Sequence, residues 1–329
     1  MNFFAVLFAL VIEQVKPLPR GNVVHDALTG WMRWTARNLD AGRDSHAWVA
    51  WCVAVLAPSL LCWLMFLGVA YVHVLLGLAF DVAVLYLTLG FRQFSHYFTD
   101  IRDALDRGDE TEARSLLAEW RHLDASELPA AEFLRHLIEH SLLAAHRHVF
   151  GVFFWFVVLS TLGFGPAGAV LYRMAEFASR FWAYRSGQAD LVVNERLTAL
   201  ALQLFQWLDH VPARLTASGF AVVGNFEEAV NCWRRDATLW KYTNEGVILA
   251  AAAGAVGVRL GGGSAPGLTP DRAKTFVAGA PPGIAEAQGS TPGPAPQLAH
   301  LRSVVALVWR SVVLWMLLLA LLSLAHLVG

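Results

Sequence analysis

Two long apolar runs follow each other directly, at residues 48–69 and 71–89. Each is close to the roughly 20 residues that an α-helix needs to cross the hydrocarbon core of a bilayer. Gly68 lies where the first run passes into the second, so the pattern predicts a tight helical hairpin in the membrane. The composition agrees: 56% of the residues are hydrophobic and 16% are charged, which is more apolar surface than a soluble domain of 329 residues could bury.

Other apolar segments predict further helices. Residues 149–163 form a third candidate span, and residues 311–328 form a last one that is nearly free of charge. Residues 3–12 are too few to span and lack the basic start and cleavage site of a signal peptide, so we expect a half-span or an interfacial helix. Residues 215–223 and 247–258 are apolar but short. We therefore predict an all-α membrane protein with about four to six transmembrane or re-entrant helices.

Polar stretches between these runs divide the chain into five predicted segments. Residues 92–147 are charged and helical in pattern, with a break at Gly108 and a helix-capping Asp109, which predicts a helical hairpin in water at the membrane face. Residues 261–299 hold seven prolines and predict a flexible tether. The segments are an N-terminal half-span and transmembrane hairpin (1–91), a cytoplasmic helical segment (92–147), a membrane core (148–260), a linker (261–299) and a C-terminal transmembrane helix (300–329).

Basic residues predict the orientation of the chain. Residues 13–46 carry five Lys and Arg residues, and residues 92–147 carry seven arginines. The positive-inside rule places both segments in the cytoplasm, so we expect a multi-pass protein of the bacterial inner membrane. The net charge of −1 gives no indication of a nucleic-acid partner. The expected partner is the lipid bilayer, and a homo-oligomer is left open. The three cysteines are too widely spaced for a disulfide framework or a zinc ribbon.

Three stretches carry motifs of one family of membrane proteins. Residues 165–173 match G-P-x-G-A-x-x-Y-R, residues 211–216 are VPARLT, and residues 232–262 run from CWRRDA to NEGVILAAAAGAVGVRLGG. These motifs resemble the CobD/CbiB family of cobalamin-pathway membrane enzymes and its relative, the AmpE family. The resemblance implies a synthase that joins an aminopropanol phosphate to the carboxyl group of adenosylcobyric acid, driven by ATP and magnesium.

Several acidic positions of the synthase pattern are replaced here. Glu139 fits the first acid of the pattern, and Glu176 stands where the family has Asn. Other residues occupy further positions where the pattern supplies Asn or acids: Leu143, Ala144, Arg147, Ser179, Phe205 and Gln206. Mg²⁺ needs hard oxygen ligands, so a fixed positive charge at Arg147 and an apolar ring at Phe205 work against a magnesium–ATP site.

The loss of acids favours the AmpE-like branch of the resemblance. Asp209, the VPARL stretch and residues 224–226 fit that branch. The preferred interpretation is therefore a non-catalytic factor in envelope sensing or regulation, of the kind tied to β-lactamase induction. The alternative is an adenosylcobinamide-phosphate synthase, for which alone Mg²⁺ and ATP would be cofactors. A transporter or lipid-binding protein is a weaker alternative.

The matched polar residues form the candidate site. Arginines in this set could bind an anionic small molecule or a cell-envelope ligand through bidentate hydrogen bonds, or they could be paired structurally with Asp209 and Asp236. We predict that Tyr172, Arg173, Pro212, Arg214 and Asn244 converge on one polar cavity at the cytoplasmic face. No metal ligand and no catalytic residue is assigned. The candidate ligand-binding residues are Glu139, Tyr172, Arg173, Glu176, Asp209, Arg214, Arg235, Asp236 and Asn244.

Two further features have competing explanations. Asp81 lies within an apolar run, where an ionisable residue normally faces a partner or a cavity; alternatively, the helix is shifted and Asp81 reaches water. His136, Glu139 and His140 match the H-x-x-E-H pattern of one class of zinc proteases. A match of this length recurs by chance in a histidine-rich segment, and Glu139 already has an explanation in the family pattern.

Overall fold

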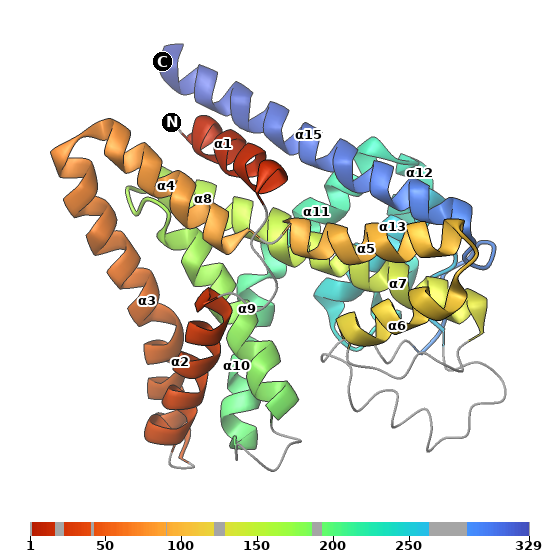
Figure 1. The fold of residues 1–329 in the computed structure, drawn as a ribbon, viewed down its shortest axis with the longest axis horizontal. Coiled ribbons are helices and arrows are strands. Elements are labelled where there is room, and N and C mark those ends of the chain that lie inside the picture. The colour runs from red at the N-terminus through yellow and green to blue at the C-terminus, as the bar shows by residue number, and fades with distance from the viewer. Residues whose placement is uncertain are drawn as a thin grey trace. The chain divides into compact units, whose positions relative to one another are not determined.

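The computed structural model describes residues 2–16, 23–40, 43–89, 91–121, 129–185, 193–262 and 288–328. Regular structure in these ranges is helical apart from isolated bridge residues, among them the antiparallel bridge between Gly261 and Ser290 (Figure 1). The described chain groups into two compact units. Unit 1 comprises Met1–Gln93, Arg147–Asp209 and Met316–Gly329, and unit 2 comprises Phe94–His146 and His210–Trp315. The five predicted segments stay a prediction.

Unit 1 is built around α9, Ala167–Arg185, which packs against α3, α8 and α10. Its buried face carries the rings of Tyr172 and Trp182, both fully buried. The first helix packs against α4. The remaining helices of this unit are α1 (Asn2–Val15), α2 (Val23–Leu39), α3 (Asp44–Val72), α4 (Val74–Thr88), α8 (Gly151–Thr161) and α10 (Glu195–Leu208).

The predicted hairpin forms, but its turn lies at His73 and not at Gly68. Gly68 is inside α3, whereas His73 has an extended backbone and separates α3 from α4. The His73 ring accepts a hydrogen bond from the Leu75 amide at 3.1 Å, which caps the second helix. The 15 residues of α4 reach only about 22 Å, short of the roughly 30 Å hydrocarbon core. The two helices of the hairpin, α3 and α4, are therefore unequal in length.

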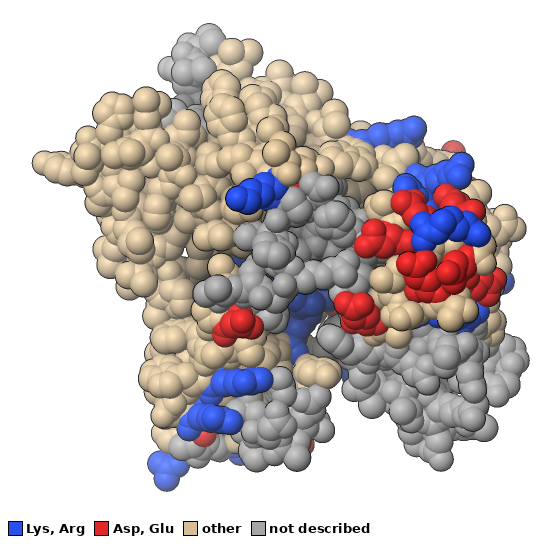
Figure 2. Space-filling view, viewed as in Figure 1, with Lys and Arg blue, Asp and Glu red and all other residues tan. Residues whose placement is uncertain are grey.

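Apolar side chains cover the outer surface of α3 and α4. Figure 2 shows almost no charge over these helices. An aqueous surface would rarely expose so continuous an apolar area, whereas lipid tails favour it. The exposed large hydrophobic residues of the hairpin include Leu56, Leu60, Leu61, Leu64, Met65, Leu67, Tyr71, Val72, Val74, Leu75 and Leu76.

Three described helical stretches are long and apolar enough to cross a membrane. They are Asp44–Val72, Ala130–Thr161 and Leu298–Ala325. Three shorter apolar helices accompany them: Asn2–Val15, Val74–Thr88 and Thr243–Val256. The second stretch begins at Ala130 rather than at the predicted residue 149, because the helix continues without a break from Ala130 to Thr161. A π-helical turn at His146–Phe150, η1, lies within this stretch.

Unit 2 is centred on α13, Thr243–Val256, which packs against α7, α11 and α12. Two glycines of α13 allow this packing. A Cβ added at Gly246 would lie 1.9 Å from the Ala237 carbonyl oxygen, and a Cβ added at Gly254 would lie 2.3 Å from the Glu228 carbonyl oxygen. The other helices of unit 2 are α5 (Phe91–Asp106), α6 (Glu110–Arg121), α7 (Ala130–Ala145), α11 (His210–Val223), α12 (Phe226–Asp236) and the short η2 (Ala237–Leu239). The last helix, α15 (Leu298–Val328), has residues in both units.

The predicted break in the charged segment is confirmed. Gly108 adopts a φ of +80°, and the Asp109 carboxylate accepts a hydrogen bond from the Glu112 amide at 2.9 Å, capping α6. Acidic and basic side chains gather over α5, α6 and the turn between them (Figure 2). The following helix, α7, differs from the expectation of a solvated face, because every residue from Phe133 to Ala145 is buried.

Candidate functional site

Tyr172 and Asp209 form a buried hydrogen bond in unit 1. The Tyr172 hydroxyl donates to Asp209 Oδ1 at 2.7 Å, and Asp209 terminates α10. Gly151 of α8 leaves room for the ring, since a Cβ there would lie 2.2 Å from Tyr172 Cζ. Burial, followed by the Asp209 charge, raises the pKa of Tyr172 well above its ordinary value. The phenol therefore stays protonated and remains a hydrogen-bond donor.

One helical turn further along α9, Glu176 lies between two arginines. Arg173 Nη1 lies 2.6 Å from Glu176 Oε2, and Arg180 Nε pairs with Oε1. Burial alone would raise the pKa of Glu176, but Arg180, Arg173 and Arg147 together hold it below its ordinary value. Glu176 is therefore a fully buried carboxylate that stays charged at neutral pH.

Arg214 and Asn244 meet in unit 2. Arg214 Nη1 donates to Asn244 Oδ1 at 3.1 Å and to the His210 carbonyl oxygen at 2.7 Å. Arg214 lies on α11, and Asn244 lies in the first turn of α13. Pro212 is buried in the first turn of α11, where its missing amide hydrogen costs no helical hydrogen bond. The VPARLT and NEGV motifs are therefore adjacent in space.

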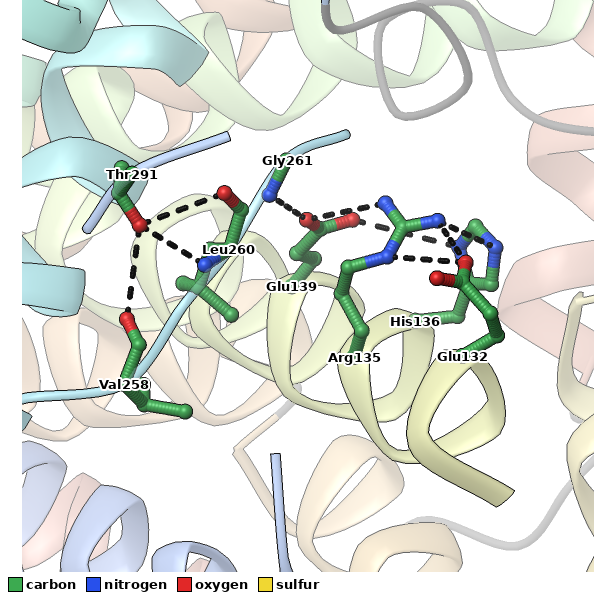
Figure 3. A network of polar contacts seen from close by, with 8 residues as sticks. All are labelled: Glu132, Arg135, His136, Glu139, Val258, Leu260, Gly261 and Thr291. Atoms are coloured by element: carbon green, nitrogen blue, oxygen red, sulfur yellow. Dashed lines mark hydrogen bonds and ion pairs between the residues drawn. The ribbon is translucent and has the colours of Figure 1, made fainter. Parts of the chain in front are cut away.

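Glu139 is at the centre of a second polar network in unit 2 (Figure 3). Its Oε1 accepts a hydrogen bond from the Gly261 amide at 2.7 Å, and Arg135 Nη1 lies 3.5 Å from the same oxygen. Arg135 also pairs with Glu132, and His136 Nδ1 lies 4.0 Å from Glu139 Oε2. The carboxylate thus joins α7 to the backbone that follows α13.

Thr291 holds the same backbone from the other side. The Thr291 hydroxyl accepts a hydrogen bond from the Leu260 amide at 2.8 Å, and the Leu260 carbonyl accepts one from the Thr291 amide at 2.8 Å. Gly262 donates to the Gly289 carbonyl oxygen at 2.6 Å. Most of the predicted flexible linker, residues 263–287, lies outside the described residues. The flanking stretches form an ordered pair, in which Gly261 and Gly262 take positive φ angles.

Arg235 and Asp236 pair with each other. Arg235 Nε and Nη2 each donate to one Asp236 carboxylate oxygen at 2.8 Å. This hydrogen bonding raises the pKa of Arg235, while burial and then the Asp236 charge raise the pKa of the neighbouring Cys232 thiol. The Arg235 side chain keeps 59% of its surface exposed, so the pair stabilises the end of α12 only weakly.

Asp81 is buried in α4 and does not reach water through a shifted helix. It is 5% exposed, and its Oδ1 has no hydrogen-bond partner among the described residues. The helix that carries it packs against α1 and α3. A functional role for this carboxyl group stays a prediction.

The described residues do not form a preassembled metal site. No three His, Cys, Asp or Glu side chains gather in these parts of the chain to hold an ion, and this includes the H-x-x-E-H residues. The Glu139 carboxylate accepts a hydrogen bond from the Gly261 amide, Asp209 accepts one from the Tyr172 hydroxyl, and Asp236 accepts one from the Arg235 guanidinium. Glu176 forms ion pairs with two arginines. Each of these four carboxylates therefore contacts at least one donor or cation of the protein.

The predicted site residues therefore fall into two groups. Tyr172, Arg173, Glu176 and Asp209 belong to unit 1. The others belong to unit 2: Glu139, Arg214, Arg235, Asp236 and Asn244. Convergence of both groups on one cavity stays a prediction. Sequence reasoning missed Arg180, although its position four residues after Glu176 on a helix is the spacing of an ion pair. It also missed Thr291, for which no local pattern gives a signal.

The described helices and their apolar surfaces define a multi-pass, all-α membrane protein. The chain belongs to the CobD/CbiB family, because the family described as CobD/Cbib protein matches residues 2–275.

Among its relatives is the cobalamin biosynthesis protein CobD of Stutzerimonas stutzeri (strain A1501), 35% identical over 286 residues, covering 85% of this chain and 83% of the relative. A protein of the same name from Chromobacterium violaceum is 37% identical over 193 residues, 58% of each chain. One from Pelobacter propionicus is 26% identical over 268 residues, 79% of each chain. No solved structure gives a significant match.

Proposed function

We propose that this protein acts in cobalamin biosynthesis, as the membrane synthase that joins aminopropanol phosphate to adenosylcobyric acid. The observation that carries the proposal is the 35% identity to a cobalamin biosynthesis protein CobD over 85% of this chain and 83% of the relative. The aligned length is too great to come from one unit alone, so it includes residues of both. The reaction itself is proposed from the motifs of this chain, which resemble those of the CobD/CbiB family.

The synthase takes precedence here over the AmpE-like interpretation, which the replacement of acidic residues in the sequence had favoured. Phe205 and Leu143 are 4% and 1% exposed, so they serve the packing of the protein interior. The centre of the Phe205 ring lies 5.7 Å from the centre of the Tyr172 ring, a distance typical of a packed aromatic pair. Apolar residues at these positions are compatible with a folded site whose polar contacts come from other residues.

An amide-forming synthase must hold two anionic substrates, and the arginines of both units suit that task. Arg173 and Arg214 each lie in a matched motif and each keep part of the side chain accessible. A guanidinium group can bind a carboxylate or a phosphate through two parallel hydrogen bonds. The apolar spans and the bacterial relatives support a multi-pass protein of the bacterial inner membrane.

Genetic complementation tests this proposal. The gene is expressed in a strain that lacks its own synthase and must make cobalamin from cobyric acid. We expect growth on cobyric acid to be restored, and feeding cobinamide, which bypasses the step, should restore growth with or without the gene. Absence of rescue by a protein that is present in the membrane fraction would contradict the proposal.

The AmpE-like regulatory role is the second candidate. It is favoured by the pairing of Glu176 with two arginines and by the burial of apolar residues at the replaced acid positions. If cobyric acid does not support growth, the same gene should instead alter β-lactamase induction when it replaces an AmpE gene.

A further inference from the structure

The outer face of α11, in unit 2, is apolar along most of its length. Val211, Leu215 and Val222 are exposed, and their spacing places them on one side of the helix with Ser218 between them. The Ser218 hydroxyl donates to the Arg214 carbonyl oxygen at 2.8 Å, so its donor is satisfied without water. The opposite side of α11 is buried and packs against α13. These four residues, Val211, Leu215, Ser218 and Val222, are called the α11 stripe below.

The helix that follows, α12, has an outer face of the opposite character. Ala229 and Cys232 of its inner face are buried, and α12 is in contact with both α11 and α13. Its exposed side chains from residue 227 onward are charged or polar: Glu227, Glu228, Asn231, Arg234 and Arg235. Two neighbouring helices of one unit therefore suit different surroundings, water at α12 and an apolar medium at α11.

The last helix, α15, changes its surface at Arg310. Before this point it carries Arg302, whose Nη2 lies 3.6 Å from Asp106 Oδ2 of the charged helix α5. Trp309 and Arg310 are exposed, and both residue types anchor spans at the level of the lipid headgroups. Residues 311–328 reach about 27 Å as a helix, close to the roughly 30 Å hydrocarbon core. Their exposed large side chains are apolar: Val313, Leu317, Leu318, Leu321, Leu322 and Leu324.

One contact within unit 2 brings α11 beside the apolar part of α15. A Cβ added at Gly219 of α11 would lie 3.4 Å from Nε1 of Trp315. Trp315 follows Arg310 by five residues, which is about 8 Å along the helix. Gly219 is next to Ser218 in the chain, so the α11 stripe belongs to a helix that lies beyond the headgroup level marked by Trp309 and Arg310.

We propose that the α11 stripe contacts the acyl chains of the bilayer. The 14 residues of α11 reach about 21 Å, so the helix enters the hydrocarbon region without crossing it, and α12 stays in water. A lipid is favoured over a second protein chain, because the adjoining part of α15 is itself a candidate membrane span. Such a short segment is tolerated in a membrane where protein covers its other side, as α13 does here.

The proposal places part of the candidate site at the edge of the membrane. Arg214 directly precedes Leu215 of the stripe, and its guanidinium group donates to Asn244 on the protein side. The contact between the VPARLT and NEGV motifs therefore borders the lipid. This inference does not depend on the synthase function, since it concerns only the medium around α11.

The test measures that medium directly. Single cysteines are introduced into the full-length protein without its three native cysteines, labelled with a nitroxide, and reconstituted in liposomes of phosphatidylcholine and phosphatidylglycerol. Electron paramagnetic resonance then compares collisions of the label with oxygen, which concentrates in lipid, and with a water-soluble nickel chelate. We expect Leu215→Cys and Val222→Cys to have an oxygen-to-nickel collision ratio severalfold above that of Asn231→Cys on α12. Leu318→Cys on α15 is the reference for a label in lipid.

Each of the other results overturns the proposal. A ratio in Leu215→Cys and Val222→Cys equal to that of Asn231→Cys would place the α11 stripe in water. Few collisions with either reagent would show that protein covers it, whether another part of this chain or a second copy. Val211→Cys, a third exposed position of the stripe, replaces either variant that does not fold. Because no activity is measured, a failure of genetic complementation leaves this outcome unaffected.

Discussion

At the scale of single residues, helix spacing explains how this chain buries its charges. Arg173 and Arg180 lie three residues before and four residues after Glu176, so both reach it from the same face of α9. Arg135 lies between Glu132 and Glu139 on α7 with the same two spacings. A charge without such a partner would be costly to bury, and a helix supplies the partner without any distant contact.

Acidification should destabilise unit 1 through Glu176. Its pKa in the folded protein lies below the ordinary value of 4.5. The stability gained from the ionised carboxylate is therefore fully present above pH 4.5 and is lost as the pH falls through the folded pKa. We expect Glu176→Gln to be less stable at pH 7 by about 3 kcal/mol, because two arginines lose their countercharge.

The measurement is the Tm of both proteins in detergent between pH 7 and pH 3. The two curves should converge at the acidic end, since the protonated carboxyl group of Glu176 and the amide group of the variant are both neutral. Parallel curves over the whole range would contradict a charged Glu176.

At the scale of elements, unit 2 depends on how closely α12 can approach α13. Gly254 lies against the Glu228 carbonyl of α12, and Gly246 lies against the Ala237 carbonyl at the start of η2. The intervening residues of α13 are small or apolar and all are buried. Small residues at helix contacts are typical of membrane proteins, where close packing replaces much of the hydrophobic driving force.

Gly254→Ala should therefore separate these helices. The new Cβ would lie 2.3 Å from the Glu228 carbonyl oxygen, so the backbone must move, at a cost of about 2–3 kcal/mol. The matched control is Gly68→Ala, where nothing lies within 4 Å and alanine favours the helix by roughly 0.5–1 kcal/mol. We expect a lower Tm in detergent for the first variant and an unchanged or higher one for the second. Equal Tm values would show that α12 and α13 are not in such close contact.

The elements also show what the sequence could and could not predict. Apolar length located α3 and α15, and the turn residues Gly108 and Asp109 located the break before α6, because each is a local property of the chain. The turn at His73 was missed, since it depends on a side-chain cap and not on a glycine. The buried state of α7 was missed because its charges are paired with one another. The motifs correctly marked Arg214 and Asn244, which are in contact. Arg180 could have been found from its spacing of four residues from Glu176, whereas Thr291 is identified only by three-dimensional packing.

At the scale of the whole molecule, the orientation in the membrane can be measured directly. The seven arginines of residues 92–147 predict a cytoplasmic location, and Ser115 on α6 is exposed. In a background without Cys52, Cys62 and Cys232, Ser115→Cys should resist an impermeant thiol reagent added to intact cells and should react after permeabilisation. Tyr71→Cys is the matched control, because it lies 93% exposed beside the α3–α4 turn, and it should react in intact cells. Labelling of Ser115→Cys from outside would reverse the predicted topology.

The π-helical turn at His146–Phe150 bears on insertions and deletions in this chain. A π-helical turn holds one residue more than an α-helical turn, so it can arise from the insertion of a single residue into a regular helix. Deleting one residue here would convert the π-helical turn into a regular α-helical turn. The side chains before the turn would then be rotated by about 100° about the helix axis relative to those after it. His146 at the start of the turn, which is hydrogen-bonded to Thr216 at 2.9 Å, and Gly151 just after it, which lies against the Tyr172 ring, could then no longer both keep their partners. A relative with one residue fewer at this turn should therefore have lost one of these two contacts while keeping both flanking helices.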